Sequence, residues 1–204
     1  MITKTGSILK TVLFLVLTAL SLPALSQNWD IDIVKAINPQ QPDAAFFRAT
    51  TSSVYAIGIA APVGLFATGL IRNDPNLKRK SYEMVAAALV ELGITGIMKN
   101  TIDRRRPAEK YPRAVFPYES HSGKSMPSGH TAMAFVTATS LSLQFKRWYV
   151  VIPSYLWATA VGYSRIYLGV HYPSDIIIGA LVGAGSAYVT HWLNCNIIQK
   201  RRRQ

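Results

Sequence analysis

The chain has 204 residues, of which 50% are hydrophobic and 16% are charged, and its formal net charge is +12. The charged fraction is well below the soluble average of about a quarter, and the apolar residues are gathered in long blocks, which favours an integral membrane protein of one domain. Nucleic acid is not an expected partner, because no aromatic and basic binding motif accompanies the positive charge. Cys195 is the only cysteine, so neither an intrachain disulfide nor a cysteine-rich metal site is expected.

Residues 1–26 have the features of a secretory signal peptide. A basic start and the apolar run 11–20 are followed by small residues at 24–26. The apolar run is shorter than the roughly 20 residues that a spanning helix needs, which favours cleavage after Ser26 over an uncleaved first membrane helix. Residues 27–204 then form a single membrane domain.

The remaining chain predicts an all-α integral membrane helical bundle. A short amphipathic helix is expected first, because Ile33, Val34 and Ile37 recur at helical spacing. Membrane-spanning helices are then predicted at residues 54–71, 82–98, 129–145, 148–163 and 175–193. The expected count is therefore about five spans after a cleaved signal peptide, or six if the first segment is retained. In the last span Gly179, Gly183 and Gly185 predict close contact with a neighbouring helix.

The distribution of basic residues predicts how the bundle is oriented. Residues 72–80, Lys146-Arg147 and the tail 200–203 fall on the inner side, as the positive-inside rule requires. Residues 99–128 and 164–175 then lie together on the outer face. Contrary to the positive-inside rule, these outer segments carry eight basic residues: Lys99, Arg104, Arg105, Arg106, Lys110, Arg113, Lys124 and Arg165. Cations on that side indicate an anionic ligand.

The first candidate motif is Lys99 followed by Arg106 and Pro107. Two cations seven residues apart would lie on one face of a helix, two turns from each other. Pro107 would end that helix, because the residue before a proline avoids the α region. The alternative interpretation is a cationic cluster that anchors the helix end at the membrane interface.

The second candidate motif is Pro127-Ser128-Gly129-His130, at the start of a predicted span. Small residues at a helix start leave backbone N–H groups that point at an anion, with the helix dipole behind them. Ser128 adds a hydroxyl donor, and His130 stands where it can deliver a proton. The alternative interpretation is an ordinary helix cap beside an interfacial histidine.

The third candidate motif is Ser164-Arg165, followed by His171 and Asp175. A histidine four residues before an aspartate can share one face of a helix turn, where the carboxylate fixes the imidazole tautomer. The alternative interpretation is a structural His–Asp pair. Taken together, the three motifs supply cations that can neutralise a phosphoryl group in transfer, while the sequence has no carboxylate cluster suited to Mg²⁺. Two histidines, one as nucleophile and one as acid, would complete a two-step transfer.

In order and spacing, the three motifs resemble the signature of the type 2 phosphatidic acid phosphatase superfamily. That superfamily includes membrane lipid phosphatases, bacterial class A acid phosphatases and vanadium haloperoxidases, and the flanking helices suit its membrane branch. The resemblance implies that His171 attacks phosphorus to form a phosphohistidine and that Asp175 orients it. It implies that His130 protonates the leaving alkoxide and then helps water to hydrolyse the intermediate. The implied phosphate ligands are Lys99, Arg106, Ser128, Gly129 and Arg165, with no metal or other cofactor.

The expected function is therefore a metal-independent lipid phosphate phosphatase at the periplasmic face of the inner membrane. Its partners would be the bilayer and a lipid phosphate: phosphatidic acid, phosphatidylglycerol phosphate, undecaprenyl diphosphate or a lipid A phosphate group. The extra cations of residues 100–128 favour the last two substrates. Two alternatives are a vanadium-dependent haloperoxidase that holds vanadate with the same residues and a non-catalytic lipid- or anion-binding membrane protein.

Several polar residues near these motifs allow two interpretations. One group could bind a second phosphate or a sugar, or could face solvent and lipid headgroups: Arg104, Arg105, Arg113, His121 and Lys124. Glu91, inside a predicted span, could be a functional acid or a satisfied structural one.

Overall fold

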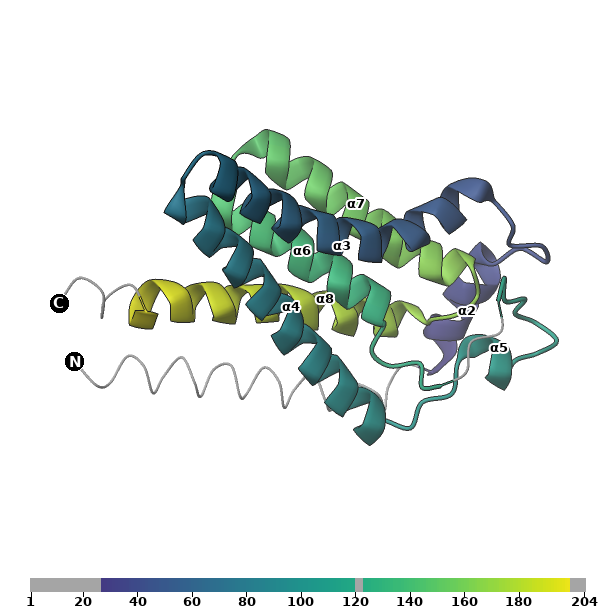
Figure 1. The fold of residues 1–204 in the computed structure, drawn as a ribbon. Helices are drawn as coiled ribbons and strands as arrows, with labels where there is room; N and C mark the ends of the chain where they lie inside the picture. The colour runs from purple at the N-terminus through teal and green to yellow at the C-terminus, as the bar shows by residue number, and fades with distance from the viewer. Residues whose placement is uncertain (1–26, 120–122, 199–204) are drawn as a thin grey trace.

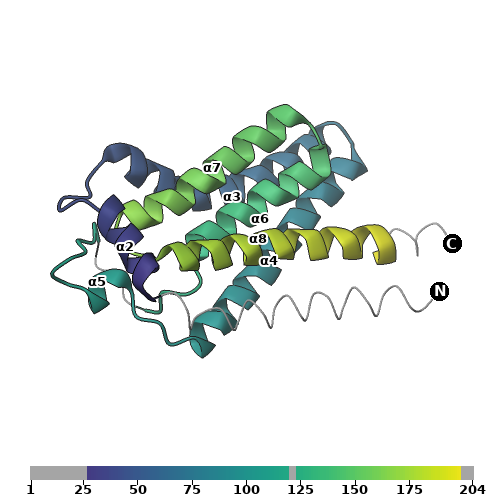
Figure 2. The same ribbon diagram turned by 180° about the vertical axis from the view of Figure 1, so that it is seen from behind.

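The computed structural model describes residues 27–119 and 123–198, and every regular element in these residues is helical, which confirms the all-α expectation (Figures 1 and 2). The helices are α2 (Gln27–Ile37), α3 (Ala45–Ile71), α4 (Pro75–Thr101), α5 (Pro107–Lys110), α6 (Gly129–Phe145), α7 (Trp148–Tyr167) and α8 (Pro173–Leu193), and a π-helical turn, η2 (Asn194–Ile198), follows α8. The predicted signal peptide and the basic tail 200–203 lie outside the described residues.

Three of these helices are long and apolar enough to cross a membrane: α3, α4 and the segment Pro173–Asn196. At 1.5 Å per residue, the 27 residues of α3 extend about 40 Å, which exceeds the roughly 30 Å of a bilayer's hydrocarbon core. Helix α6 has 17 residues and extends only about 25 Å. The count of five spans therefore stays a prediction.

Helix α6 is the centre of the bundle and packs against α3, α4, α7 and α8. Most of its residues between 131 and 140 are buried. It approaches α8 so closely that a Cβ atom at Gly183 would lie 2.2 Å from the carbonyl oxygen of Ala132, and Gly179 is similarly enclosed by backbone. The predicted close contact is confirmed for these two glycines, whereas Gly185 faces open space. This crossing sets the start of α6 beside the start of α8.

The basic loops and the three candidate motifs lie at opposite ends of the bundle, as the charge pattern predicted (Figures 1 and 2). The α3–α4 turn, the α6–α7 turn and the end of α8 gather at one end. Lys80 connects the start of α4 to the end of α6. Its Nζ donates to the Gln144 carbonyl at 3.0 Å and lies 4.1 Å from the centre of the Phe145 ring. The other end carries α2, α5 and the loops that precede α6 and α8.

Helix α2 forms where the apolar spacing predicted a short helix, and its packed face includes Val34 and Ile37 but not Ile33. Ile31 and Val34 are buried against Val115 and Tyr172, while Ile33, expected on the apolar face, is 37% exposed. Through this face α2 packs against α7 and α8 at the end of the bundle that carries the candidate motifs.

Candidate functional site

Lys99 and Arg106 do not share a helical face, so that prediction is wrong. Helix α4 ends at Thr101, and Pro107 begins α5 instead of ending α4. Arg106 is extended (φ −69°, ψ 157°), as expected for a residue before proline. Alternate side chains of an extended segment share a side, so Arg104 and Arg106 both turn inward while Arg105 is exposed.

His171 and Asp175 are neighbours, although they do not lie on one helix turn. His171 precedes α8, and Asp175 lies in its first turn and folds back, so that its Oδ2 accepts from the backbone N–H of Tyr172 at 2.9 Å. His171 Nδ1 is 3.4 Å from the same oxygen, which is long for a hydrogen bond. Both side chains are buried, at 2% and 0% exposure.

The surroundings of His171 favour a neutral ring. Burial lowers the pKa of this imidazole well below its usual range, Arg165 and Arg106 act in the same direction, and Asp175 opposes them. His171 Nε2 lies 3.2 Å from Arg106 Nη1. A guanidinium only donates, so Nε2 is the acceptor and the ring proton is on Nδ1, facing Asp175. The Nε2 lone pair of a neutral imidazole can attack an anionic electrophile held by the nearby cations.

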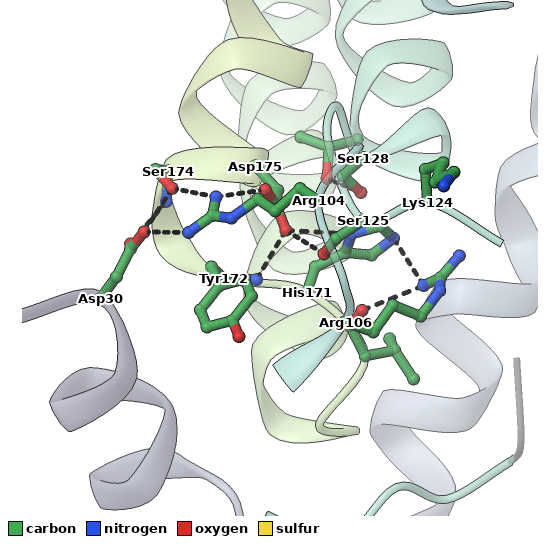
Figure 3. A network of polar contacts seen from close by, with 12 residues as sticks. Asp30, Arg104, Arg106, Lys124, Ser125, Ser128, His171, Tyr172, Ser174 and Asp175 are labelled. Atoms are coloured by element: carbon green, nitrogen blue, oxygen red, sulfur yellow. Dashed lines mark hydrogen bonds and ion pairs between the residues drawn. The ribbon is translucent and has the colours of Figure 1, made fainter. Parts of the chain in front are cut away.

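Arg104 has a structural role that neither of its two interpretations from the sequence included. Its Nη1 donates to Asp175 Oδ1 at 2.6 Å and to Ser174 Oγ at 2.6 Å, and its Nη2 donates to Asp30 Oδ2 at 2.7 Å (Figure 3). The guanidinium lies 4.0 Å from the centre of the Tyr172 ring. Burial disfavours its charge, but the two carboxylates outweigh burial and raise the pKa of Arg104.

Asp30 and Ser125 are further site residues that the sequence did not reveal. Ser125 Oγ donates to Asp175 Oδ2 at 2.5 Å. Asp30 is 2% exposed. A signal for Asp30 did exist, because it precedes the buried Val34 by one helical turn and an acid on the buried face of a helix needs a partner. The sequence near Asp30 did not indicate which residue this partner is.

The second motif forms the beginning of α6. Ser128 is buried, its backbone N–H donates to the Asp175 carbonyl at 3.1 Å, and its Oγ accepts from Thr131 Oγ1 at 3.0 Å. The N–H groups of the first helical turn, from Gly129 onward, have no acceptor within the helix. His130 is half-buried, and its ring centre lies 5.1 Å from that of Tyr55 in an edge-on arrangement. The N-terminal end of α6 is therefore joined to the Asp175 turn.

Arg165 and Lys99 are held by neutral oxygen atoms. Arg165 is 3% exposed, and its Nη1 donates to Thr51 Oγ1 at 2.7 Å, while its buried Nε has no hydrogen-bond partner among the described residues. Lys99 Nζ donates to the Lys124 carbonyl at 3.0 Å. A buried cation without a counter-ion is costly, and an incoming anion removes that cost.

Fewer of the extra cations are available than the sequence suggested. Arg104 is engaged by two carboxylates, and Lys124 forms an ion pair with Asp103. Arg105 and Arg113 are exposed, and His121 lies outside the described residues.

Glu91 is fully buried in α4 and belongs to a separate contact. Its Oε1 accepts from Thr95 Oγ1 at 2.7 Å, and Oε2 has no hydrogen-bond partner among the described residues. Thr95 in turn faces Gly129. Within residues 27–119 and 123–198, no three His, Cys, Asp or Glu side chains are arranged to hold a metal ion.

Comparison with known proteins places these motifs in a family. The sequence pattern described as PAP2 superfamily matches residues 82–198, more than half of the chain. One relative is the bacitracin transport permease protein BcrC of Bacillus licheniformis, 32% identical over 133 residues, or 64% of this chain and 63% of that protein. Another is the lipid A 1-phosphatase of Rhizobium johnstonii, 32% identical over 102 residues, or 48% and 41%. The chain thus spans less than two thirds of these relatives' lengths.

Solved structures share the fold. The crystal structure of Aquifex aeolicus LpxE has a TM-score of 0.67 and 26% identity, and the match covers 83% of this chain and 98% of that one. The transmembrane PAP2 type phosphatidylglycerolphosphate phosphatase of Bacillus subtilis has a TM-score of 0.69 at 21% identity, over 93% and 96%, which is a likeness of fold alone. The family pattern spans all three motifs, and the helical bundle matches these structures, so the chain belongs to the PAP2 superfamily.

Proposed function

We propose that this protein is a metal-independent lipid phosphate phosphatase that works through a phosphohistidine. The observation that carries the proposal is the environment of His171, whose neutral ring directs Nδ1 to Asp175 and Nε2 to the cation Arg106 at 3.2 Å. A structural His–Asp pair needs no cation beside Nε2, the ring nitrogen that faces away from the aspartate. A nucleophile that attacks an anion does need one there.

In the first step, Nε2 of His171 attacks phosphorus, an N–P bond forms, and the bond from phosphorus to the lipid oxygen breaks. His130 donates a proton to the leaving alkoxide, which departs as the lipid alcohol. The imidazole gains positive charge, and Asp175 stabilises it through Nδ1–H. Arg106, which donates to Nε2 in the free site, turns to a phosphate oxygen.

In the second step, water attacks the phosphohistidine and gives its proton to His130, which is now neutral. The N–P bond breaks, inorganic phosphate leaves, and both histidines return to their starting states. The same five phosphate ligands serve both steps: Lys99, Arg106, Ser128, Gly129 and Arg165. Three positive charges and the α6 N–H groups match the charge that spreads over the equatorial oxygens.

The proposed substrate is a lipid phosphate or diphosphate that reaches the site from the bilayer. Relatives named as lipid A phosphatases and as an undecaprenyl-diphosphatase, from Sulfolobus acidocaldarius, support lipid A phosphate groups and polyprenyl diphosphates. The engagement of Arg104 and Lys124 weakens the argument from surplus cations, so the preference now rests on these relatives.

The proposed location is the inner membrane, with the site facing the periplasm. Its support is the separation of the basic loops from the candidate motifs, which lie at opposite ends of the bundle. Three candidate spans support a multi-pass arrangement.

The test is phosphate release by the purified full chain in detergent, over phosphatidic acid, phosphatidylglycerol phosphate, undecaprenyl diphosphate and lipid A, with EDTA present. Wild type should release phosphate from at least one lipid, and His171→Gln should abolish release. His191→Gln, at the far end of the bundle, is the matched control and should remain active. Rapid quenching with labelled substrate should trap an acid-labile, base-stable phosphoprotein in wild type. A strict Mg²⁺ requirement, or release unchanged by His171→Gln, contradicts the mechanism.

A further inference from the structure

The helix that precedes the family match contributes a buried charge to the site. Asp30 lies in α2, outside the matched residues 82–198. Its Oδ1 accepts from the Ser174 backbone N–H at 3.0 Å, and its Oδ2 accepts from Ser174 Oγ at 2.5 Å and from Arg104 Nη2 at 2.7 Å. The carboxylate thus sits at the N-terminal end of α8, where the helix dipole favours negative charge.

Arg104 connects this carboxylate to the one beside His171. Figure 3 shows its guanidinium between Asp30 and the Ser174–Asp175 turn. A guanidinium presents its donors in a rigid planar fork, so it can bind two carboxylates at once, and the Tyr172 ring 4.0 Å away supports its face. Because Ser174 binds both Asp30 and Arg104, the three segments form a closed ring of hydrogen bonds.

We infer that Asp30 and Arg104 are positioning residues for phosphoryl transfer, which act by holding Asp175 in the orientation that directs its Oδ2 at His171. The inference rests on the proposed function. It makes α2, which contains none of the three motifs, part of the catalytic unit.

The hydrogen bonds on Asp175 explain how the orientation is set. Oδ1 accepts from Arg104, and Oδ2 accepts from Ser125 Oγ and the Tyr172 N–H. Three donors in different directions fix the plane of the carboxylate. Two of them come from short, well-anchored groups, whereas Arg104 has a long flexible side chain. Asp30 removes that freedom by binding Arg104, and it also binds Ser174, the residue next to Asp175.

The charges of the ring also favour the transfer step. Two carboxylates and one guanidinium carry a net charge of −1 beside a neutral imidazole. This charge lies on the Nδ1 side of His171, whereas Arg106 lies on the Nε2 side. It therefore stabilises the positive charge that the imidazole gains as the N–P bond forms.

The experiment compares Asp30→Asn, Arg104→Met and the double variant with wild type, as full chains in detergent. Asp32→Asn is the matched control, because Asp32 is an exposed acid on the same helix. The substrate is the most rapidly hydrolysed lipid of the panel, and the rates are expressed per mole of protein in the monodisperse gel-filtration peak. The measurements are kcat, KM and inhibition by inorganic phosphate.

Each single variant should lower kcat by roughly 10- to 100-fold, the loss expected when a catalytic group is misplaced by about 1 Å. KM and phosphate inhibition should stay within about threefold, since the phosphate ligands are untouched. The double variant should lose less than the product of the two single losses, because Asp30 and Arg104 act on Asp175 through one shared ring of hydrogen bonds. Asp32→Asn should match wild type.

The inference is overturned if kcat of Asp30→Asn is within about twofold of wild type. It is also overturned if the two single losses multiply in the double variant, or if the variants raise KM and leave kcat unchanged. If Asp30→Asn gives no folded protein, Ser174→Ala is the second test of the inference, because it removes one hydrogen bond to Asp30 without changing a charge. A kcat lowered at constant KM then supports the inference, and an unchanged kcat overturns it. A wild-type protein that releases no phosphate from any lipid contradicts the proposed function instead.

Discussion

The crossing of α6 and α8 provides the sharpest structural prediction, the substitution Gly183→Ala. A Cβ atom at position 183 would lie 2.2 Å from the Ala132 carbonyl oxygen, 2.9 Å from Val136 N and 3.0 Å from Ala132 C. All three are backbone atoms that cannot rotate away, so the two helices must separate by roughly 1 Å to restore ordinary contact. Overpacking of this kind costs about 1–3 kcal/mol.

The matched control is Gly185→Ala, two residues along the same helix, where an added Cβ meets nothing within 4 Å. An exposed helical Gly→Ala exchange stabilises by about 1 kcal/mol, and this gain applies to both variants. The difference between them therefore isolates the contact with α6. Gly183→Ala should unfold several degrees below Gly185→Ala in a thermal unfolding assay in detergent.

The same separation should slow the reaction. It stretches the 3.1 Å hydrogen bond from the Ser128 N–H to the Asp175 carbonyl, which joins the start of α6 to the His171 partner. A displacement of about 1 Å at such a point costs on the order of 100-fold in rate, so kcat of Gly183→Ala should fall by one to two orders of magnitude. If Gly183→Ala and Gly185→Ala have equal melting temperatures and equal kcat, the reasoning about the crossing is wrong.

Three further predictions concern protonation, anion binding and orientation. Because burial lowers the pKa of His171, its imidazole takes up a proton at a higher pH in the unfolded protein than in the folded one. The associated stability is present above pH 6.5 and is lost as the pH falls toward the folded pKa. Between pH 6.5 and 5, wild type should therefore lose about 2 kcal/mol more than His171→Gln, measured by chemical unfolding, and parallel curves would contradict this. Arg165→Lys keeps the charge but loses the planar fork, so inorganic phosphate should inhibit it roughly 10-fold more weakly, and unchanged inhibition would argue against direct contact. In a Cys195→Ser background, an impermeant maleimide should label Lys110→Cys but not Arg72→Cys in spheroplasts, and the reverse pattern would invert the proposed orientation.

Hydropathy located the helices but not all of their ends. Helix α6 covers the predicted 129–145, because Pro127-Ser128 marks its start and Lys146 adopts a left-handed conformation (φ 45°) at its end. Helix α3 begins at Ala45, whereas the apolar segment begins at residue 54. Hydropathy detects only the part of a helix that suits lipid, so it misses a polar start. Here the polar start supplies Thr51, the partner of Arg165.

Motif spacing predicted that His171 and Asp175 meet, but not the ring of hydrogen bonds formed by Asp30, Arg104 and Ser174. His171 and Asp175 are four residues apart, so their contact is a local property of the chain. Asp30 is separated by 144 residues from Ser174 and by 74 from Arg104. No periodicity or spacing relates positions so distant, because their contact depends on how α2 packs against α8. Arg104 therefore looked like one more surplus cation in a basic segment.

The charge balance of the site has a consequence for turnover. Arg104 is shared by Asp175 and Asp30, and none of Lys99, Arg106 and Arg165 takes part in an ion pair between described residues. In the proposed mechanism these three positive charges meet a phosphate group that carries close to two negative charges at neutral pH. Inorganic phosphate, the product, meets the same cations as the substrate but lacks the lipid. A site built to attract the anion so strongly also retains it, so product release is a step that the proposed mechanism makes slow.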